Sequence, residues 1–130
     1  MKNQRNRKSL SELIKQELKN AEEEGVQFMT FNVATEDRSM TAGRIVVAYF
    51  FPFCNEEALL INFAFCSPRD TFDRKYGQFI AYRRLMKPDG PIFVETPKRI
   101  IRAMAAISLI KEAHRREVPW MRTVQVKDLR

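Results

Sequence analysis

The sequence RIVVAYFFPFCNEEALLINFAFC, residues 44–66, contains two runs of apolar residues separated by a short polar segment. The runs, 44–53 and 58–66, are rich in valine, isoleucine and phenylalanine, which favour β-strands. Pro52 has no N–H group to donate to a neighbouring strand, so it must lie at an edge or an end of the first strand. The polar residues between the runs are typical of a turn, and the segment therefore predicts two antiparallel strands.

Two further segments extend this pattern into a sheet. An apolar run over residues 26–35 precedes it, separated by the polar turn TEDRSMTAG, and Ile92 to Glu95 form a short fourth run. Runs of strands joined by short turns are typical of an antiparallel meander. We therefore expect a meander sheet of about four strands.

Three helices are expected around this sheet. Residues 9–24 carry leucine, isoleucine and alanine on one stripe, which predicts an amphipathic N-terminal helix. Ser67 and Pro68 have the character of a helix cap and a first helical residue, so we expect a second helix to follow over 70–87. A third is predicted over 97–117. Because strands and helices do not alternate strictly, the fold class is α+β, with the sheet packed against the N-terminal helix and two later basic amphipathic helices.

The length and composition fit one intracellular domain. A chain of 130 residues with 45% hydrophobic residues can bury a single core. We assign residues 1–8 to a basic flexible arm and 9–130 to a single α+β domain. No membrane span or signal peptide is apparent, and Cys54 and Cys66 are interpreted as two reduced core thiols, so the expected location is the cytoplasm.

Positive charge is concentrated in parts of the chain. The formal net charge is +7, and segments 1–8, 69–87 and 97–117 each carry a net charge of +4. Arg83 is predicted to project into the apolar stripe of its helix, and Lys98 and Arg99 oppose the dipole at a helix start. We expect the basic residues to converge on one outward surface that binds an anion. The candidate anion-binding or nucleic-acid-binding residues are Arg74, Lys75, Arg83, Arg84, Lys98, Arg99 and Arg102.

The residues needed for catalysis are sparse. His114 is the only histidine, and its place near the end of the last helix favours a structural role. Asp89, Glu95 and Lys98 resemble a nuclease metal motif, but the spacing is one residue too long and Pro97 interrupts it. No nucleophile elbow, phosphate loop or dinucleotide fingerprint is present. We therefore expect no enzyme, no catalytic residue, no metal and no cofactor.

One stretch resembles a known group of proteins. It comprises Phe65-Cys66-Ser67-Pro68 followed by Asp70, Phe72, Arg74, Lys75, Gly77, Ile80, Ala81, Arg83 and Leu85. This stretch, about a sixth of the chain, resembles an element of small uncharacterised accessory proteins of bacteriophages and mobile elements. The resemblance implies a non-enzymatic accessory protein that counters host defence or manages nucleic acid, in the host cell cytoplasm if phage-encoded. It implies no role for a particular residue.

Three functions follow from these observations. The leading hypothesis is a protein that binds a polyanion, above all nucleic acid, through its basic helices. The second is an anti-CRISPR-type inhibitor that binds a host defence nuclease, with Tyr82, Phe53 or Trp120 as anchors. The third is an oligomeric sponge that sequesters a small nucleotide signal. The apolar centre of 97–117 makes that segment the candidate surface for a homo-oligomer.

Overall fold

The four predicted strands form one antiparallel sheet in the order β1-β2-β3-β4. A computed structural model describes residues 2–34, 43–52 and 57–130, with side chains from residue 9 onward. The strands are β1 (Gln27–Asn32), β2 (Arg44–Phe50), β3 (Ala58–Cys66) and β4 (Ile92–Glu95). The predicted α+β meander is confirmed, and Pro52 follows the end of β2 as expected.

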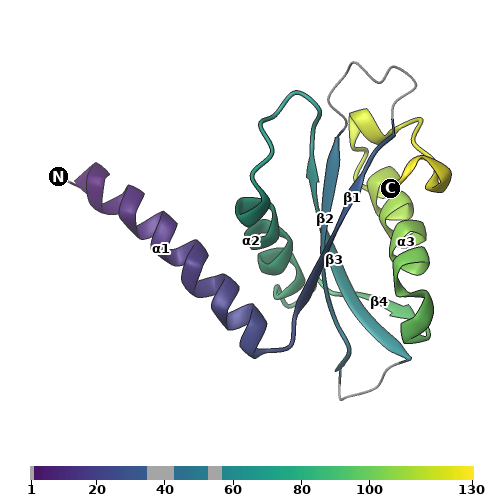
Figure 1. Ribbon diagram of the computed structural model, residues 1–130, viewed down its shortest axis with the longest axis horizontal. Helices are drawn as coiled ribbons and strands as arrows, with labels where there is room; N and C mark the ends of the chain where they lie inside the picture. Colours follow the sequence, from purple (N-terminus) through teal and green to yellow (C-terminus); the bar gives the residue numbers. More distant parts are fainter. Residues whose placement is uncertain (1, 35–42, 53–56) are drawn as a thin grey trace.

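The helices cover both faces of the sheet, as Figure 1 shows. The helices are α1 (Lys2–Glu23), α2 (Arg74–Leu85) and α3 (Ile101–Arg115), the last preceded by a 3₁₀ turn at Lys98–Ile100. Helix α2 packs on one face and α3 on the other. Alternating side chains of the central strands face the two layers, because successive residues of a strand point to opposite sides. Ile45 and Val47 therefore join the α3 core, and Val46 and Ala48 the α2 core.

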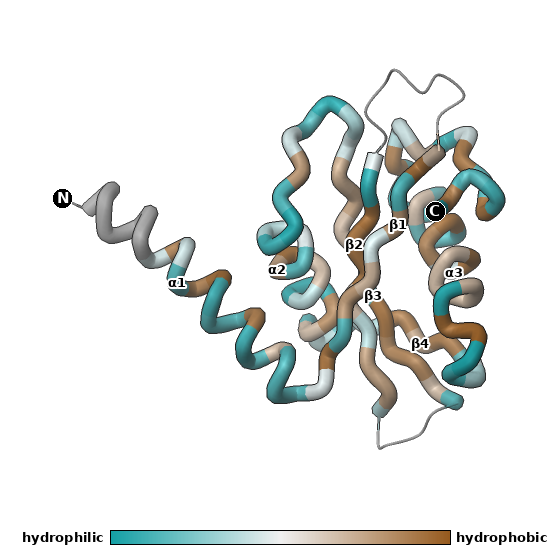
Figure 2. The backbone as a smooth tube through the Cα atoms, in the orientation of Figure 1, coloured by the Kyte–Doolittle hydropathy of each residue, from teal (hydrophilic) through white to brown (hydrophobic). Residues whose placement is uncertain are grey.

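Helix α1 begins at Lys2, before the Ser9 start predicted from the sequence. Residues 2–8 contain neither glycine nor proline, so nothing in their sequence breaks the helix. The C-terminal end of the helix lies closest to the rest of the chain, and the helix axis points away from the sheet toward the N-terminus (Figures 1 and 2). There Tyr82 of α2 donates a hydrogen bond of 2.9 Å to Glu24, and burial together with this bond raises the pKa of Tyr82 to about 12.

Helix α2 starts later than predicted. Its cap is Asp73, whose carboxylate accepts a hydrogen bond of 3.0 Å from the backbone N–H of Tyr76. The hydroxyl of Ser67 instead accepts from the N–H of Arg69 and closes a separate turn. The predicted start after Pro68 is therefore wrong, because an aspartate with extended backbone outcompetes the earlier serine for the cap.

The buried face of α2 also differs from the prediction. The sequence places Phe72, Tyr76, Phe79 and Met86 on one apolar face with Arg83, whereas the structure exposes Tyr76, Met86 and Arg83 and buries Leu85. The reason is Gly77: a Cβ atom there would lie 2.8 Å from Cγ2 of Val46. The small residues at 77 and 81 bring this side of the helix against the sheet, and a hydrophobicity pattern gives glycine little weight.

The C-terminal segment closes the far edge of the sheet. Two 3₁₀ turns, Pro119–Met121 and Val126–Asp128, follow α3, and Leu129 forms an isolated bridge with Val33 beside β1. The C-terminal segment thus adds a single bridge to this edge of the sheet. No helix in the part of the chain that the structure describes has the length and apolar character needed to cross a membrane.

Candidate anion-binding groove at the open edge of strand β3

Strand β3 is paired along only half of one side. Its register with β4 runs from Ala58 opposite Glu95 to Ile61 opposite Ile92. Beyond Ile61, no strand of the described ranges pairs with this edge. Backbone groups at such an edge need other partners, or they recruit another chain.

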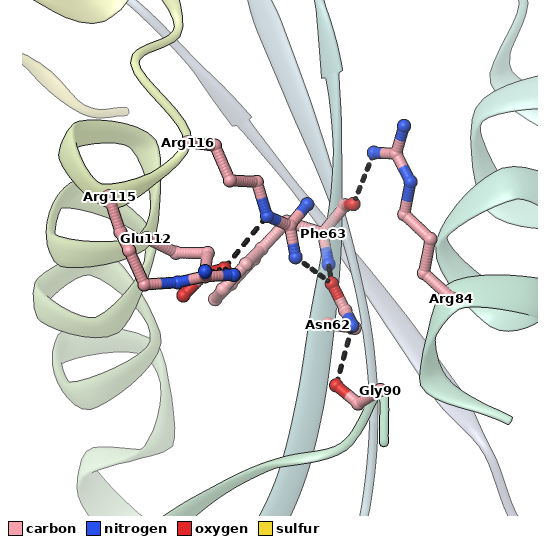
Figure 3. Close-up of polar contacts among 7 residues, drawn as sticks. All are labelled: Asn62, Phe63, Arg84, Gly90, Glu112, Arg115 and Arg116. Atoms are coloured by element: carbon pink, nitrogen blue, oxygen red, sulfur yellow. Dashed lines mark hydrogen bonds and ion pairs between the residues drawn. The ribbon is translucent and has the colours of Figure 1, made fainter. Parts of the chain in front are cut away.

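Side chains occupy this open edge instead (Figure 3). The N–H of Phe63 donates to Oδ1 of Asn62 at 2.7 Å, and the carbonyl oxygen of Phe63 accepts from Nη1 of Arg84 at 2.8 Å. The amide nitrogen of Asn62 donates to the carbonyl oxygen of Gly90 at 2.7 Å. These bonds tie the strand edge to α2 and to the loop before β4.

A second arginine reaches the same edge from the other face. Arg116 follows the last residue of α3, and its Nη2 donates to Oδ1 of Asn62 at 2.7 Å. Figure 3 shows Arg84 and Arg116 approaching β3 from opposite sides. Burial and the charge of Arg116 together lower the pKa of the Arg84 guanidinium. Two like charges are thus held near one another at this edge, an arrangement that a bound anion would stabilise.

One carboxylate partly neutralises this cluster. Oε1 of Glu112 accepts from Nε of Arg116 at 2.8 Å and from Nε and Nη2 of Arg115. The Glu112 side chain is 10% exposed, and the hydrogen bonds from Arg115, followed by those from Arg116, hold the pKa of Glu112 below its usual value. The carboxylate therefore stays ionised and orients both guanidinium groups.

The hydrogen bonds of the ionised Glu112 carboxylate to Arg115 and Arg116 should make the stability of the protein depend on pH. A folded-state pKa below the unfolded value means that Glu112 contributes stability above its ordinary pKa of 4.5 and loses that contribution as the pH falls. We expect Glu112→Gln to remove this part of the acid sensitivity, about 1 kcal/mol of unfolding free energy. Urea unfolding of both proteins at pH 7 and pH 3 measures it. An identical fall in stability in the two proteins would contradict the assignment.

The groove around these residues carries an excess of positive charge. A cavity of about 440 Å³ lies between the end of α2, the loop before β4 and the end of α3. Its lining includes four basic and two acidic side chains. The charged residues are Arg84, Lys87, Asp89, Glu112, Arg115 and Arg116. Guanidinium groups fixed in this way present N–H donors in the geometry that phosphate oxygens accept.

Of the seven candidate residues predicted from the sequence, the structure places one in the groove. Arg84 lies in the groove, whereas Arg74, Lys75 and Arg83 are exposed elsewhere on α2. Lys98 and Arg99 lie in the turn before α3, on the opposite face of the sheet. The seven residues therefore do not share one outward surface, because α2 and α3 cover opposite faces of the sheet and only the end of each helix reaches the groove.

Two of these arginines have local roles. Arg83, predicted to lie in an apolar stripe, instead reaches solvent with its guanidinium 5.2 Å from the centre of the Phe79 ring. Arg102 donates to the backbone oxygens of Thr30 and Arg130, at 3.2 and 3.0 Å, and covers the Phe31 ring at 4.2 Å. Arg102 thus secures the C-terminal segment at the β1 edge, far from the groove.

Sequence reasoning did not select Arg115, Arg116, Asn62 or Glu112 as site residues. Two signals point to them in retrospect. Asn62 is a polar residue inside the apolar run ALLINFAFC, and a buried amide requires hydrogen-bond partners. Glu112 lies three and four residues before the two arginines, the spacing at which helical side chains meet.

None of His114, Cys66, Tyr82 and Trp120 lines the groove. His114 is exposed in the last turn of α3, a helix-terminal position as expected. Cys66 is a half-buried free thiol, and Cys54 and Phe53 lie outside the described residues. Tyr82 is buried and Trp120 half-buried, so neither is an exposed anchor. Within the described ranges, no group of three or more histidine, cysteine, aspartate or glutamate side chains is placed to hold a metal ion.

Comparison with known proteins adds no assignment. No protein-family model, no curated protein and no solved structure matches this chain.

Proposed function

We propose that this protein is a non-enzymatic nucleic-acid-binding protein whose phosphate site is the groove at the open edge of β3. The observation that supports it most strongly is the meeting of Arg84 and Arg116 at one strand edge, from opposite faces of the sheet. The bond from Nη1 to Phe63 uses one of the five N–H donors of the Arg84 guanidinium and fixes its position. A phosphate in the groove would relieve the repulsion between the two cations.

The groups in the groove favour binding over catalysis. Guanidinium groups stay protonated at neutral pH, so they orient and neutralise an anion and do not transfer protons. The Glu112 carboxylate accepts bonds from two arginines, which also holds it ionised. The resemblance of residues 65–85 to phage accessory proteins agrees with a binding role, exerted in the cytoplasm of the host cell.

A small nucleotide is the second candidate ligand. The groove has the volume of a small-molecule site, about 440 Å³, and three arginines whose guanidinium groups suit a phosphate. In this case two exposed residues, Ile100 just before α3 and Ile107 within it, would support the proposed homo-oligomer. Native mass spectrometry of the purified protein distinguishes the two candidates. A retained nucleotide together with the mass of an oligomer would indicate a protein that sequesters a small nucleotide.

Charge removal at the groove tests the nucleic-acid proposal. We expect the double change Lys87→Gln with Arg115→Gln to weaken binding of a fluorescent oligonucleotide at least tenfold at low salt, since two phosphate contacts are lost. The matched control is Lys98→Gln with Arg99→Gln, which removes the same charge about 20 Å away at the other end of α3. Equal losses of affinity in both variants would indicate that the oligonucleotide is attracted by net charge alone, and they would contradict a phosphate site in the groove.

A further inference from the structure

A second cavity adjoins the groove and shares Arg84 with it. Its volume is about 360 Å³, and it lies between the second half of β3, the start of α2 and the segment that joins them. Its walls are mostly apolar and include Val46, Ala64, Phe72 and Ile80. Much of its lining comes from the stretch between Phe65 and Leu85 that was singled out by its sequence.

Two aromatic side chains border the cavity. Phe72 is half-buried, and the guanidinium of Arg44 covers its ring at 4.7 Å. Tyr76 is 49% exposed, with its ring centre 6.3 Å from that of Phe79. One ring is therefore held in place, and the other is open to a ligand. Aromatic faces beside a basic groove are the combination on which unpaired bases stack.

The charges around the cavity indicate which part of a ligand enters it. Asp70 and Asp73 line it together with Arg84. Carboxylates repel phosphate but accept hydrogen bonds from the amino groups of bases. Arg84 lies where the cavity meets the basic groove, so a base inside the cavity would place its phosphate beside Arg84.

We infer that the protein binds single-stranded nucleic acid, with one unstacked base in the cavity beside Tyr76 and the adjoining phosphates in the β3-edge groove. This inference rests on the proposed function and adds the class of nucleic acid. A duplex cannot supply such a base without unpairing and unstacking it, which costs a few kcal/mol.

Polarisation with matched oligonucleotides tests the inference. We expect a single strand to bind roughly tenfold more tightly than the duplex of the same sequence, and Tyr76→Ala to remove most of this preference, since one base–aromatic stack is lost. Phe93→Ala is the control, because Phe93 is an exposed aromatic residue, at 63%, outside the cavity. Circular dichroism checks that both variants fold.

The reactivity of Cys66 gives a second measurement. This thiol lines the cavity, and in a Cys54→Ser background its alkylation should slow at least fivefold with saturating single strand and stay unchanged with inorganic phosphate. Equal binding of single strand and duplex, together with unprotected Cys66, would overturn the inference and leave the phosphate groove standing. Failure of both nucleic acids to bind would overturn the proposed function as well.

Discussion

Gly90→Ala is expected to destabilise the protein by about 3 kcal/mol or more, because the new methyl group has no space. A Cβ atom at this position would lie 1.9 Å from the backbone carbonyl oxygen of Arg84. Backbone cannot rotate away as a side chain can, so the loop must move. That movement would also break the bond from Asn62 to the Gly90 carbonyl and disturb the groove. Urea unfolding measures the loss.

Gly25→Ala is the matched control for this change. Gly25 has a φ of +80°, but nothing lies within 4 Å of the position of its Cβ. Alanine there should cost only about 1–2 kcal/mol, the strain of a left-handed backbone. If Gly90→Ala lowered the free energy of unfolding no more than Gly25→Ala does, the result would contradict the close contact between the loop before β4 and the end of α2.

Arg84→Met is expected to weaken oligonucleotide binding at least tenfold, the largest effect of any single substitution in the groove. Its guanidinium lines both the groove and the adjoining cavity, and a hydrogen bond to an ionised group contributes about 1.5–3 kcal/mol. The lost bond to Phe63 should reduce stability by about 1 kcal/mol. Fluorescence polarisation and urea unfolding separate the two effects.

The neighbouring arginine provides the control. Arg83→Met removes the same charge one residue away, where the side chain is exposed over the Phe79 ring. We expect less than a threefold change in affinity. Arg84→Lys should recover part of the affinity by keeping the charge, but less than all of it, because an ammonium lacks the fork of N–H donors. A larger effect at Arg83 would move the site to the outer face of α2.

The sheet could be predicted from the sequence because its signals are local. Runs of valine, isoleucine and phenylalanine between polar turns define the strands, and Pro52 marks the end of one. The phase of α2 could not be obtained in the same way. Gly77 and Ala81 turn toward the sheet because they are small, whereas a hydrophobicity pattern looks for large residues.

The site was harder to predict because it forms across the sheet. Arg84 and Arg116 are 32 residues apart. They meet because α2 and α3 cover opposite faces of the sheet and because β4 begins only at Ile92, which leaves this edge of β3 without a described partner strand beyond Ile61. Composition shows that both helices are basic, but it does not reveal which face of the sheet each one covers. The prediction of one shared basic surface therefore grouped Lys98, Arg99 and Arg102 with Arg84, although these three residues do not line the groove.

The salt dependence of oligonucleotide binding tests the central claim most directly. With about three cations of the β3-edge groove contacting phosphates, the logarithm of the binding constant should fall against the logarithm of salt concentration with a slope of roughly −2, and roughly −1 for Lys87→Gln with Arg115→Gln. The Lys98→Gln with Arg99→Gln control should keep the slope of the natural protein. No binding at 50 mM salt, or the same slope in all three proteins, would contradict a phosphate site at the open edge of β3.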